Sequence, residues 1–279
     1  MCLIAFAIGA STRWPLVVAA NRDEFLSRPT QPLGRWQTDA GQDIISGRDL
    51  RAGGTWMGLT PGGRVAFLTN VREANPPAAP RSRGELVTRW LAQSGDAAAF
   101  ATALAQGGAV YGGFNLVLGD FQSNAWTWLS NRSATGSALH MQALAPGVYG
   151  LSNAALNTPW PKTTALQNAL RASLQAASDP EALQAPLWAA LGSRERAPRE
   201  HLPATGVPLA FEDALSSAFV DFPEHAYGTR SSTVLLASAQ GRSGAAGHWE
   251  VQLEERTHPH EAPVAGADVQ RSHAVLSWQ

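Results

Sequence analysis

The only cysteine of this 279-residue chain is Cys2, directly after Met1. If Met1 is removed, Cys2 carries both a thiol and a free α-amine. An α-amine has a pKa of about 7.7–8.0, so near neutral pH it can accept the proton of the adjoining thiol. A thiol activated by a neighbouring base is a nucleophile suited to acyl transfer. The alternative is that Cys2 is a small buried hydrophobic residue, as most free cysteines are.

The residues after Cys2 form an apolar run that is too short to cross a bilayer. This run lacks the basic start of a signal peptide, and Arg13 follows it closely. We therefore expect a buried strand over residues 2–9, which would hold Cys2 at the mouth of a sheet.

The composition narrows the function classes. The chain has 21 Lys and Arg against 22 Asp and Glu, so it has no basic surplus for nucleic acid or an anionic membrane. A hydrophobic content of 44% without a long apolar stretch indicates a soluble globular protein with no stable membrane insertion. A single cysteine excludes an internal disulfide and suits a reducing compartment, and we expect a cytoplasmic protein.

Several predicted strands end in polar residues. A second strand over residues 16–23 ends in the sequence Asn-Arg-Asp-Glu, and a hairpin over residues 55–70 turns at Pro61-Gly62-Gly63. Further strands are expected near residues 114–118, 125–129, 139–144, 148–153, 232–239 and 248–255. Polar groups at the strand ends are Cys2, Asn21, Arg22, Asp23, Glu24, Thr69, Asn70, Ser152, Asn153, Thr229 and Arg230.

Paired helices separate the groups of strands. Ser82 and Glu85 predict a capping box before a helix, and Asp96 predicts the cap of a second one. Two more helices are expected near residues 162–177 and 180–191, while residues 257–279 are expected to form an irregular tail. Strands and paired helices in this order predict one α+β domain over residues 1–279, built as a four-layer αββα sandwich with the first strand inside a sheet.

Amide hydrolysis by an N-terminal nucleophile needs more than a thiol and its amine. A carboxylate or amide must hold the amine, donors must stabilise the oxyanion, and a charge must orient the substrate. The polar strand ends supply each of these groups. The alternative for any one Asn or Asp is a local hydrogen bond to the backbone near a turn.

Five segments carry a resemblance to a known family. The opening Met-Cys-Leu-Ile, the sequence Asn-Arg-Asp-Glu at 21–24, Gly-Gly-Thr-Trp-Met-Gly at 53–58, Leu-Thr-Asn at 68–70 and Gly-Leu-Ser-Asn at 150–153 resemble the NRDE family. This is the group of the transport and Golgi organisation protein 2 homologues. The family in turn resembles the N-terminal nucleophile hydrolases, close to choloylglycine hydrolase and penicillin V acylase, and this resemblance also implies the αββα fold.

The resemblance implies roles for five residues. Cys2 matches the nucleophile and Asp23 the carboxylate that holds the α-amine. Asn70 and Asn153 match the positions that contact the oxyanion and the amine, and Arg230 matches a late active-site arginine. The remaining polar strand ends, Asn21, Arg22, Glu24, Thr69 and Ser152, are expected to contact the substrate.

One position departs from the acylase pattern. Those enzymes carry an arginine three residues before the aspartate, where this chain has Ala20, and Arg22 adjoins Asp23 instead. We expect this shift to turn the Arg22 guanidinium to the other face of the strand.

Two functions remain open: the first follows from the polar strand ends and the resemblance to hydrolases, and the second is implied by the resemblance to the NRDE family. One is a cysteine amidohydrolase that cleaves the C–N amide bond of a small acyl amide without a cofactor or metal. The other is a non-catalytic binding and trafficking protein that uses the same cleft for haem or an acyl-CoA. Haem would want an axial His, Cys, Met or Tyr. The seven histidines show no paired spacing beyond His258 and His260.

Overall fold

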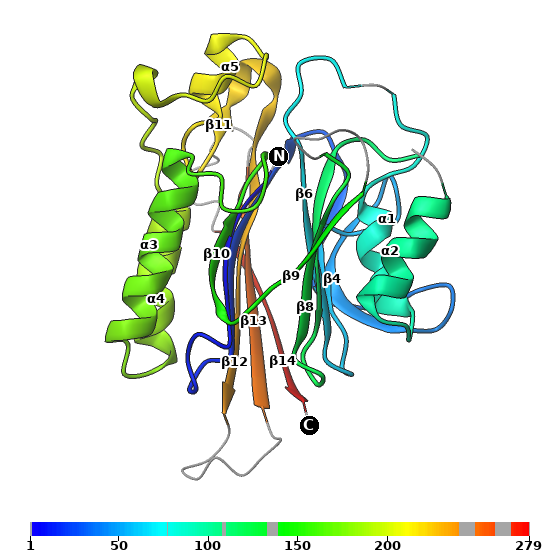
Figure 1. The fold of residues 1–279 in the computed structure, drawn as a ribbon. Helices are drawn as coiled ribbons and strands as arrows, with labels where there is room; N and C mark the ends of the chain where they lie inside the picture. Colours follow the sequence, from blue (N-terminus) through cyan, green and yellow to red (C-terminus); the bar gives the residue numbers. More distant parts are fainter. Residues whose placement is uncertain are drawn as a thin grey trace.

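The computed structural model describes residues 2–76, 78–107, 110–132, 139–239, 249–259 and 269–278. They form two antiparallel sheets that lie face to face (Figure 1). The first sheet has the order β10 (Gly147–Leu151), β1 (Cys2–Ile8), β2 (Leu16–Phe25), β12 (Tyr227–Ala239), β13 (Trp249–Thr257) and β14 (Gln270–Trp278), with β11 (Asp221–Phe222) paired to β12. The second has the order β3 (Thr30–Gln37), β4 (Asp43–Asp49), β5 (Met57–Leu59), β6 (Arg64–Asn70), β7 (Phe114–Asp120), β8 (Ala125–Ser130) and β9 (His140–Ala143).

Helices cover the outer face of each sheet (Figure 1). Helices α3 (Pro161–Ala176) and α4 (Pro180–Leu191) pack on the first sheet, and α1 (Gly84–Ala92) and α2 (Ala97–Gln106) pack on the second. The short helix α5 (Leu209–Ala214) lies at the end of the sandwich where β1 begins. Two 3₁₀ turns, η1 (Arg199–His201) and η2 (Pro223–His225), complete the described helices. The expected αββα sandwich is thus confirmed, with β1 inside its sheet.

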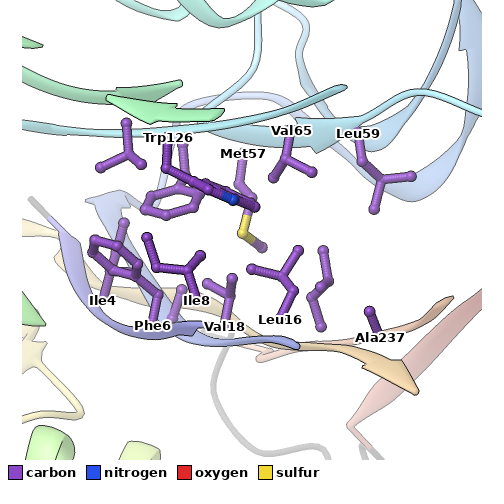
Figure 2. Packing of buried hydrophobic residues seen from close by; sticks show 14 of the residues in the cluster. Ile4, Phe6, Ile8, Leu16, Val18, Met57, Leu59, Val65, Trp126 and Ala237 are labelled. Carbon is purple, nitrogen blue, oxygen red and sulfur yellow. The ribbon is translucent and has the colours of Figure 1, made fainter. Parts of the chain in front are cut away.

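Strand alternation divides the core into layers. In β1, Ile4, Phe6 and Ile8 face the second sheet, where Figure 2 shows them against Met57 and Trp126. The intervening Leu3, Ala5 and Ala7 face α3 and α4. Because neighbouring residues of a strand point to opposite faces, the even-numbered Cys2 belongs to the face between the sheets.

The Gly-Gly segment before β5 brings α1 close to the sheet. Gly53 has a φ of +76°, which few residues other than glycine adopt. A Cβ on Gly54 would lie 2.5 Å from the carbonyl carbon of Gly84, so only glycine fits. This contact sets the first turn of α1 against Thr55, whose N–H donates to the Gly84 oxygen over 3.3 Å.

Two expectations about local structure are wrong. The residues 257–279 contain strand β14, which pairs with β13 and ends in the buried Trp278. The capping box is also absent, because Arg83 is the N-cap and makes no side-chain cap bond. The Glu85 carboxylate is taken by Arg81, whose Nε donates to it over 2.8 Å. The Asp96 cap is confirmed by a 2.8 Å bond from the Ala99 N–H.

Within the described ranges, no helix is both long and apolar enough to span a bilayer.

Candidate functional site at the start of β1

A cavity of about 660 Å³ opens at the end of the sandwich where β1 begins. Its lining joins the ends of both sheets with the first turn of α1 and with α5. Predicted site residues in this lining are Cys2, Arg22, Asp23, Glu24 and Asn70. Trp56, Arg72, Arg83 and Tyr227 also line it and were missed by the sequence analysis.

Cys2 and Arg22 share one face of the sheet. They are paired in the antiparallel register of β1 and β2, and both line the cavity. The expectation that Arg22 turns away from this face is therefore wrong. Positions 20 and 22 differ by two residues, and a shift of two along a strand keeps the face. The Arg22 guanidinium stacks 4.3 Å from the ring centroid of Trp56 and donates to Thr30 over 3.2 Å.

The Cys2 thiol is a buried group at the cavity wall. Burial raises the pKa of Cys2, because a thiolate is poorly solvated there. The Asp23 charge also raises that pKa, while the Arg22 guanidinium and the Asp23 backbone N–H lower it. The thiol thus depends on its neighbours to ionise.

Asp23 lies on the strand next to Cys2 but belongs to the helix-facing series of β2 with Val17 and Ala19. Its Oδ1 accepts a 2.7 Å hydrogen bond from Thr229, and its backbone carbonyl accepts a 2.8 Å bond from the Tyr227 hydroxyl. Burial raises the pKa of Asp23, whereas the charge of Lys162 lowers it. Asp23 is therefore a buried carboxylate that needs a nearby cation to stay ionised.

Lys162 is that cation, and it is the only lysine in the sequence. It lies in the first turn of α3, is 6% exposed and donates to the Leu215 carbonyl over 2.8 Å. Burial lowers the pKa of Lys162 to about 8, although the Asp23 charge raises it. The signal that could have revealed this residue is its type, since every other side chain among the 21 Lys and Arg is an arginine.

Asn70 and Asn153 are joined in a polar network beside Cys2. The Asn153 Nδ2 donates to the Asn70 backbone oxygen over 2.9 Å and to its Oδ1 over 3.1 Å. Ser152 donates to the Cys2 carbonyl over 3.1 Å, and Thr69 donates to the Ser152 carbonyl over 2.5 Å. Asn70 lines the cavity, whereas Asn153 is buried behind it. Asn70 is therefore the amide that a substrate can reach, and the other three hold it and Cys2 in place.

Asn21 makes structural contacts. Its Nδ2 donates to the carbonyls of Leu191 and Ala218, and its Oδ1 accepts a 2.6 Å bond from Ser232. These bonds fasten β2 to the end of α4. Glu24 lies at the cavity and is 3.8 Å from Arg22.

Arg230 holds a loop instead of the cavity wall. It follows Thr229 at an irregularity of the β2–β12 register. One guanidinium nitrogen donates to three backbone carbonyls, those of Phe25, Leu26 and Arg28, over 2.8–3.1 Å. Arg230 is not one of the described residues that line the cavity.

Arg72 closes the cavity from the side of α5. It forms a buried ion pair with Glu212 of that helix, and its guanidinium lies 4.7 Å from the ring centroid of Trp160. Its backbone N–H donates to the Asn153 carbonyl over 2.8 Å. Arg72 thus ties α5 to the strand end that carries Asn70.

Comparisons with known proteins agree with this architecture. The family model described as Transport and Golgi organisation 2 matches residues 1–252. The Transport and Golgi organization protein 2 homolog of Bos taurus is 34% identical over 254 residues, which are 86% of this chain and 90% of that protein. The homolog of Homo sapiens is 32% identical over 279 residues, covering 92% and 99%.

A solved structure shares the fold. The Caenorhabditis elegans N-acylethanolamine-hydrolyzing acid amidase ortholog superposes with a TM-score of 0.51 at 12% identity, covering 84% of this chain and 92% of that one. This likeness supports the N-terminal nucleophile hydrolase fold and no more. On the family match and the two relatives, the chain belongs to the Transport and Golgi organisation 2 family.

Proposed function

We propose that the protein is a cysteine amidohydrolase of the N-terminal nucleophile type, acting on the C–N bond of a small acyl amide. The observation that carries this proposal is the position of Cys2. Its thiol lies at the wall of a cavity of about 660 Å³, with Arg22 directly across the strand pair and Asn70 in the same lining.

The proposed reaction begins after Met1 has been removed. The α-amine of Cys2 takes the thiol proton, and the thiolate attacks the amide carbonyl carbon. The protonated α-amine then gives its proton to the leaving nitrogen as the C–N bond breaks, which leaves a thioester on Cys2. Water, deprotonated by the same amine, attacks the thioester and releases the carboxylic acid and the free thiol.

Asp23 and Lys162 have supporting roles in this mechanism. Asp23 is the carboxylate that holds and orients the α-amine, and it does so best as an anion. Burial raises the pKa of Asp23, and the Lys162 charge is the largest of the effects that lower it, so Lys162 favours the ionised carboxylate. Lys162 is therefore a positioning residue that acts through Asp23.

Asn70 is proposed as the oxyanion donor. A tetrahedral intermediate places negative charge on the former carbonyl oxygen, which a fixed amide N–H stabilises. The two hydrogen bonds from Asn153 fix Asn70 in the cavity wall before substrate arrives. Arg22 would lower the pKa of the thiol and favour its ionised form.

An N-acyl ethanolamide is a reasonable first substrate to try, since the structural neighbour is named for hydrolysing that class. The test begins with the intact mass of the purified protein, which reports whether Met1 is present. A panel of acyl amides is then incubated with the wild type and with Cys2→Ala. Turnover by the wild type alone supports the proposal, and equal turnover by both overturns it.

A second candidate is ligand carriage without chemistry. The lining combines arginines with Phe25, Trp56, Phe211 and Tyr227, a mixture that suits a flat or acyl-chain ligand with acidic groups. No described lining residue is His or Met, so haem would have to use Cys2 or Tyr227 as its axial ligand. Saturable binding of haem or a long-chain acyl-CoA with no product formed would favour this function.

We further propose that the protein works in the cytoplasm. A nucleophilic thiol stays active only where it is not oxidised, and a reducing compartment protects it. Fractionation of cells that produce the protein tests this location.

A further inference from the structure

The charges of the cavity wall are largely paired with one another. Five arginines are found among its described lining residues: Arg22, Arg28, Arg72, Arg81 and Arg83. Arg28 and Asp49 form a 2.5 Å ion pair, Arg72 pairs with Glu212, and Arg81 pairs with Glu85. These three guanidinium groups are neutralised by the protein itself.

The carboxylates of the wall are engaged as well. Glu73 accepts a 2.5 Å bond from Arg132, and Asp23 faces the charge of Lys162. Glu24 lies between two arginines, 3.8 Å from Arg22 and 3.7 Å from Arg28. Arg22 has a further partner in the Trp56 ring. The described lining residues therefore include no spare carboxylate for another cation.

Among the described lining residues, Arg83 is the arginine that takes part in none of these pairs. Its Nη1 donates to the Gly113 carbonyl over 3.0 Å, and no carboxylate among the described residues lies within 4.0 Å of it. The side chain is half-buried, and burial lowers the pKa of Arg83, although the charges of Cys2 and of the more distant Glu24 raise it. A guanidinium withdrawn from water without a counter-ion is costly, and a bound anion would offset that cost.

The position of Arg83 is fixed by the fold. It is the N-cap of α1, and the close contact of Gly54 with Gly84 holds the adjoining turn against the sheet. Arg83 and Cys2 line the same cavity, and the Cys2 charge raises the pKa of Arg83. A ligand group bound by Arg83 would therefore lie near the reacting carbon.

We propose that Arg83 is the anion-binding residue of the substrate site, so that the natural ligand is an acyl amide carrying a carboxylate or phosphate close to its scissile bond. This inference deepens the proposed function by naming the substrate class. Arg81 lies on the same wall, but its side chain is exposed and already forms an ion pair with Glu85, whereas Arg83 is half-buried and forms none.

The first test uses two alkylating reagents that differ in charge. Iodoacetate is an anion and iodoacetamide is its neutral counterpart, and both alkylate Cys2, the only thiol in the chain. In the wild type we expect iodoacetate to react faster relative to iodoacetamide than it does with free cysteine. In Arg83→Gln this rate ratio should fall about five- to tenfold, with Arg83→Lys restoring most of it. Glutamine retains an N–H that can donate to Gly113.

Arg81→Gln is the matched control, because it removes one positive charge from the same wall. The proposal is overturned if Arg81→Gln lowers the ratio as much as Arg83→Gln does, since the effect would then be general electrostatics. It is also overturned if Arg83→Gln slows both reagents equally, which would mean that Arg83 acts on the thiol. Failure of both reagents to reach Cys2 would exclude an anion site beside it.

The second test measures binding without turnover. Cys2→Ala protein is titrated by calorimetry with N-dodecanoylglycine, N-dodecanoyl-phosphoethanolamine and the neutral N-dodecanoylethanolamine. We expect at least one anionic amide to bind about tenfold or more tightly than the neutral one, and the difference to vanish with Arg83→Gln. The comparison of the two anions identifies carboxylate or phosphate. Equal binding of all three overturns the inference, while a wild type that binds anions but hydrolyses none of them overturns only the proposed function.

Discussion

Cys2 and Arg22 are cross-strand neighbours in the antiparallel pair of β1 and β2, with side chains that are 9% and 5% exposed. A buried thiol and a buried guanidinium on one face form a pair in which the cation favours the thiolate. Arg22 is thus one of the groups, with the charge of the α-amine, that lower the pKa of Cys2 against the effect of burial.

Replacement of Arg22 tests that pairing. In Arg22→Leu we expect the pKa of Cys2 to rise, because a cation that stabilises the thiolate is lost. Alkylation by iodoacetamide at pH 7.5 should slow about three- to tenfold, and the midpoint of its pH profile should move to higher pH. Arg22→Lys keeps the charge and should stay near the wild type. An unchanged profile in Arg22→Leu would show that the two groups are not coupled.

The role of the α-amine can be separated from that of the thiol. An alanine inserted between Met1 and Cys2 leaves the thiol in the chain but moves the α-amine onto another residue. We expect amide turnover to fall at least a hundredfold, as when a general base is lost, while iodoacetamide still labels Cys2. Cys2→Ser should lose both turnover and labelling. Retained turnover in the insertion variant would exclude the α-amine as base.

Asn70 and Asn153 should differ in what they affect. Asn70→Ala removes the amide that lines the cavity, and we expect kcat to fall about 10²–10³-fold with little loss of stability. Asn153→Ala leaves buried polar partners unsatisfied and should lower the free energy of unfolding by about 1–3 kcal/mol. Urea denaturation and kcat are measured for both variants. The assignment is wrong if Asn70→Ala retains full turnover.

The lowered pKa of Lys162 predicts that the free energy of unfolding rises at alkaline pH. Its pKa is lowered from the ordinary lysine value to about 8 in the folded protein. Between about pH 8 and 10 the unfolded chain therefore binds a proton that the folded protein does not, so the free energy of unfolding increases with pH. Compared with Lys162→Met, the wild type should gain about 1–3 kcal/mol over this range. The free energy of unfolding is measured by urea denaturation at each pH. If its dependence on pH is the same for both proteins, the pKa of Lys162 is not lowered.

Arg230 is expected to matter for folding. Arg230→Ala removes a donor from the carbonyls of Phe25, Leu26 and Arg28 at the end of β2 and in the loop after it. The Phe25 and Arg28 carbonyls keep the Arg28 N–H and the Thr30 hydroxyl as donors, so we expect a loss of about 1–3 kcal/mol in the free energy of unfolding. Well below the melting temperature, kcat should change less than tenfold. Arg35→Ala is a suitable control, since Arg35 is exposed and pairs with Asp43. A large loss of kcat without loss of stability would show that Arg230 is an active-site residue, as the family resemblance implies.

Much of the fold could be predicted from local patterns. The apolar runs of β1 and β2 are continuous because both faces of the sheet are covered, by α3 and α4 on one side and by the second sheet on the other. Strand β14 was missed because its residues are mostly polar and half-exposed until Trp278. Strand β3 was missed for a similar reason, since it is only partly buried along its length. Strand β4 is mostly buried, but Ile44 and Ile45 are its only large apolar residues, so its sequence carries little strand pattern.

The site was harder to predict than the fold. Cys2, Asp23 and Asn70 were found because each lies at the end of a recognisable strand. Lys162 and Arg83 belong to helices that the patterns do predict, but their proximity to Cys2 depends on how those helices pack on the sheets. Packing of that kind leaves no local mark in the sequence.

The burial of Lys162 also determines what amine chemistry can reach the protein. Because the 279 residues contain no other lysine, the folded protein offers no exposed side-chain primary amine. Acetyl transfer, ubiquitin attachment and amine-reactive dyes would all require either the chain terminus or prior unfolding. An amine-reactive fluorescent ester applied at neutral pH would therefore label the terminal amine selectively. A second label, on Lys162, would report the fraction of molecules that have unfolded.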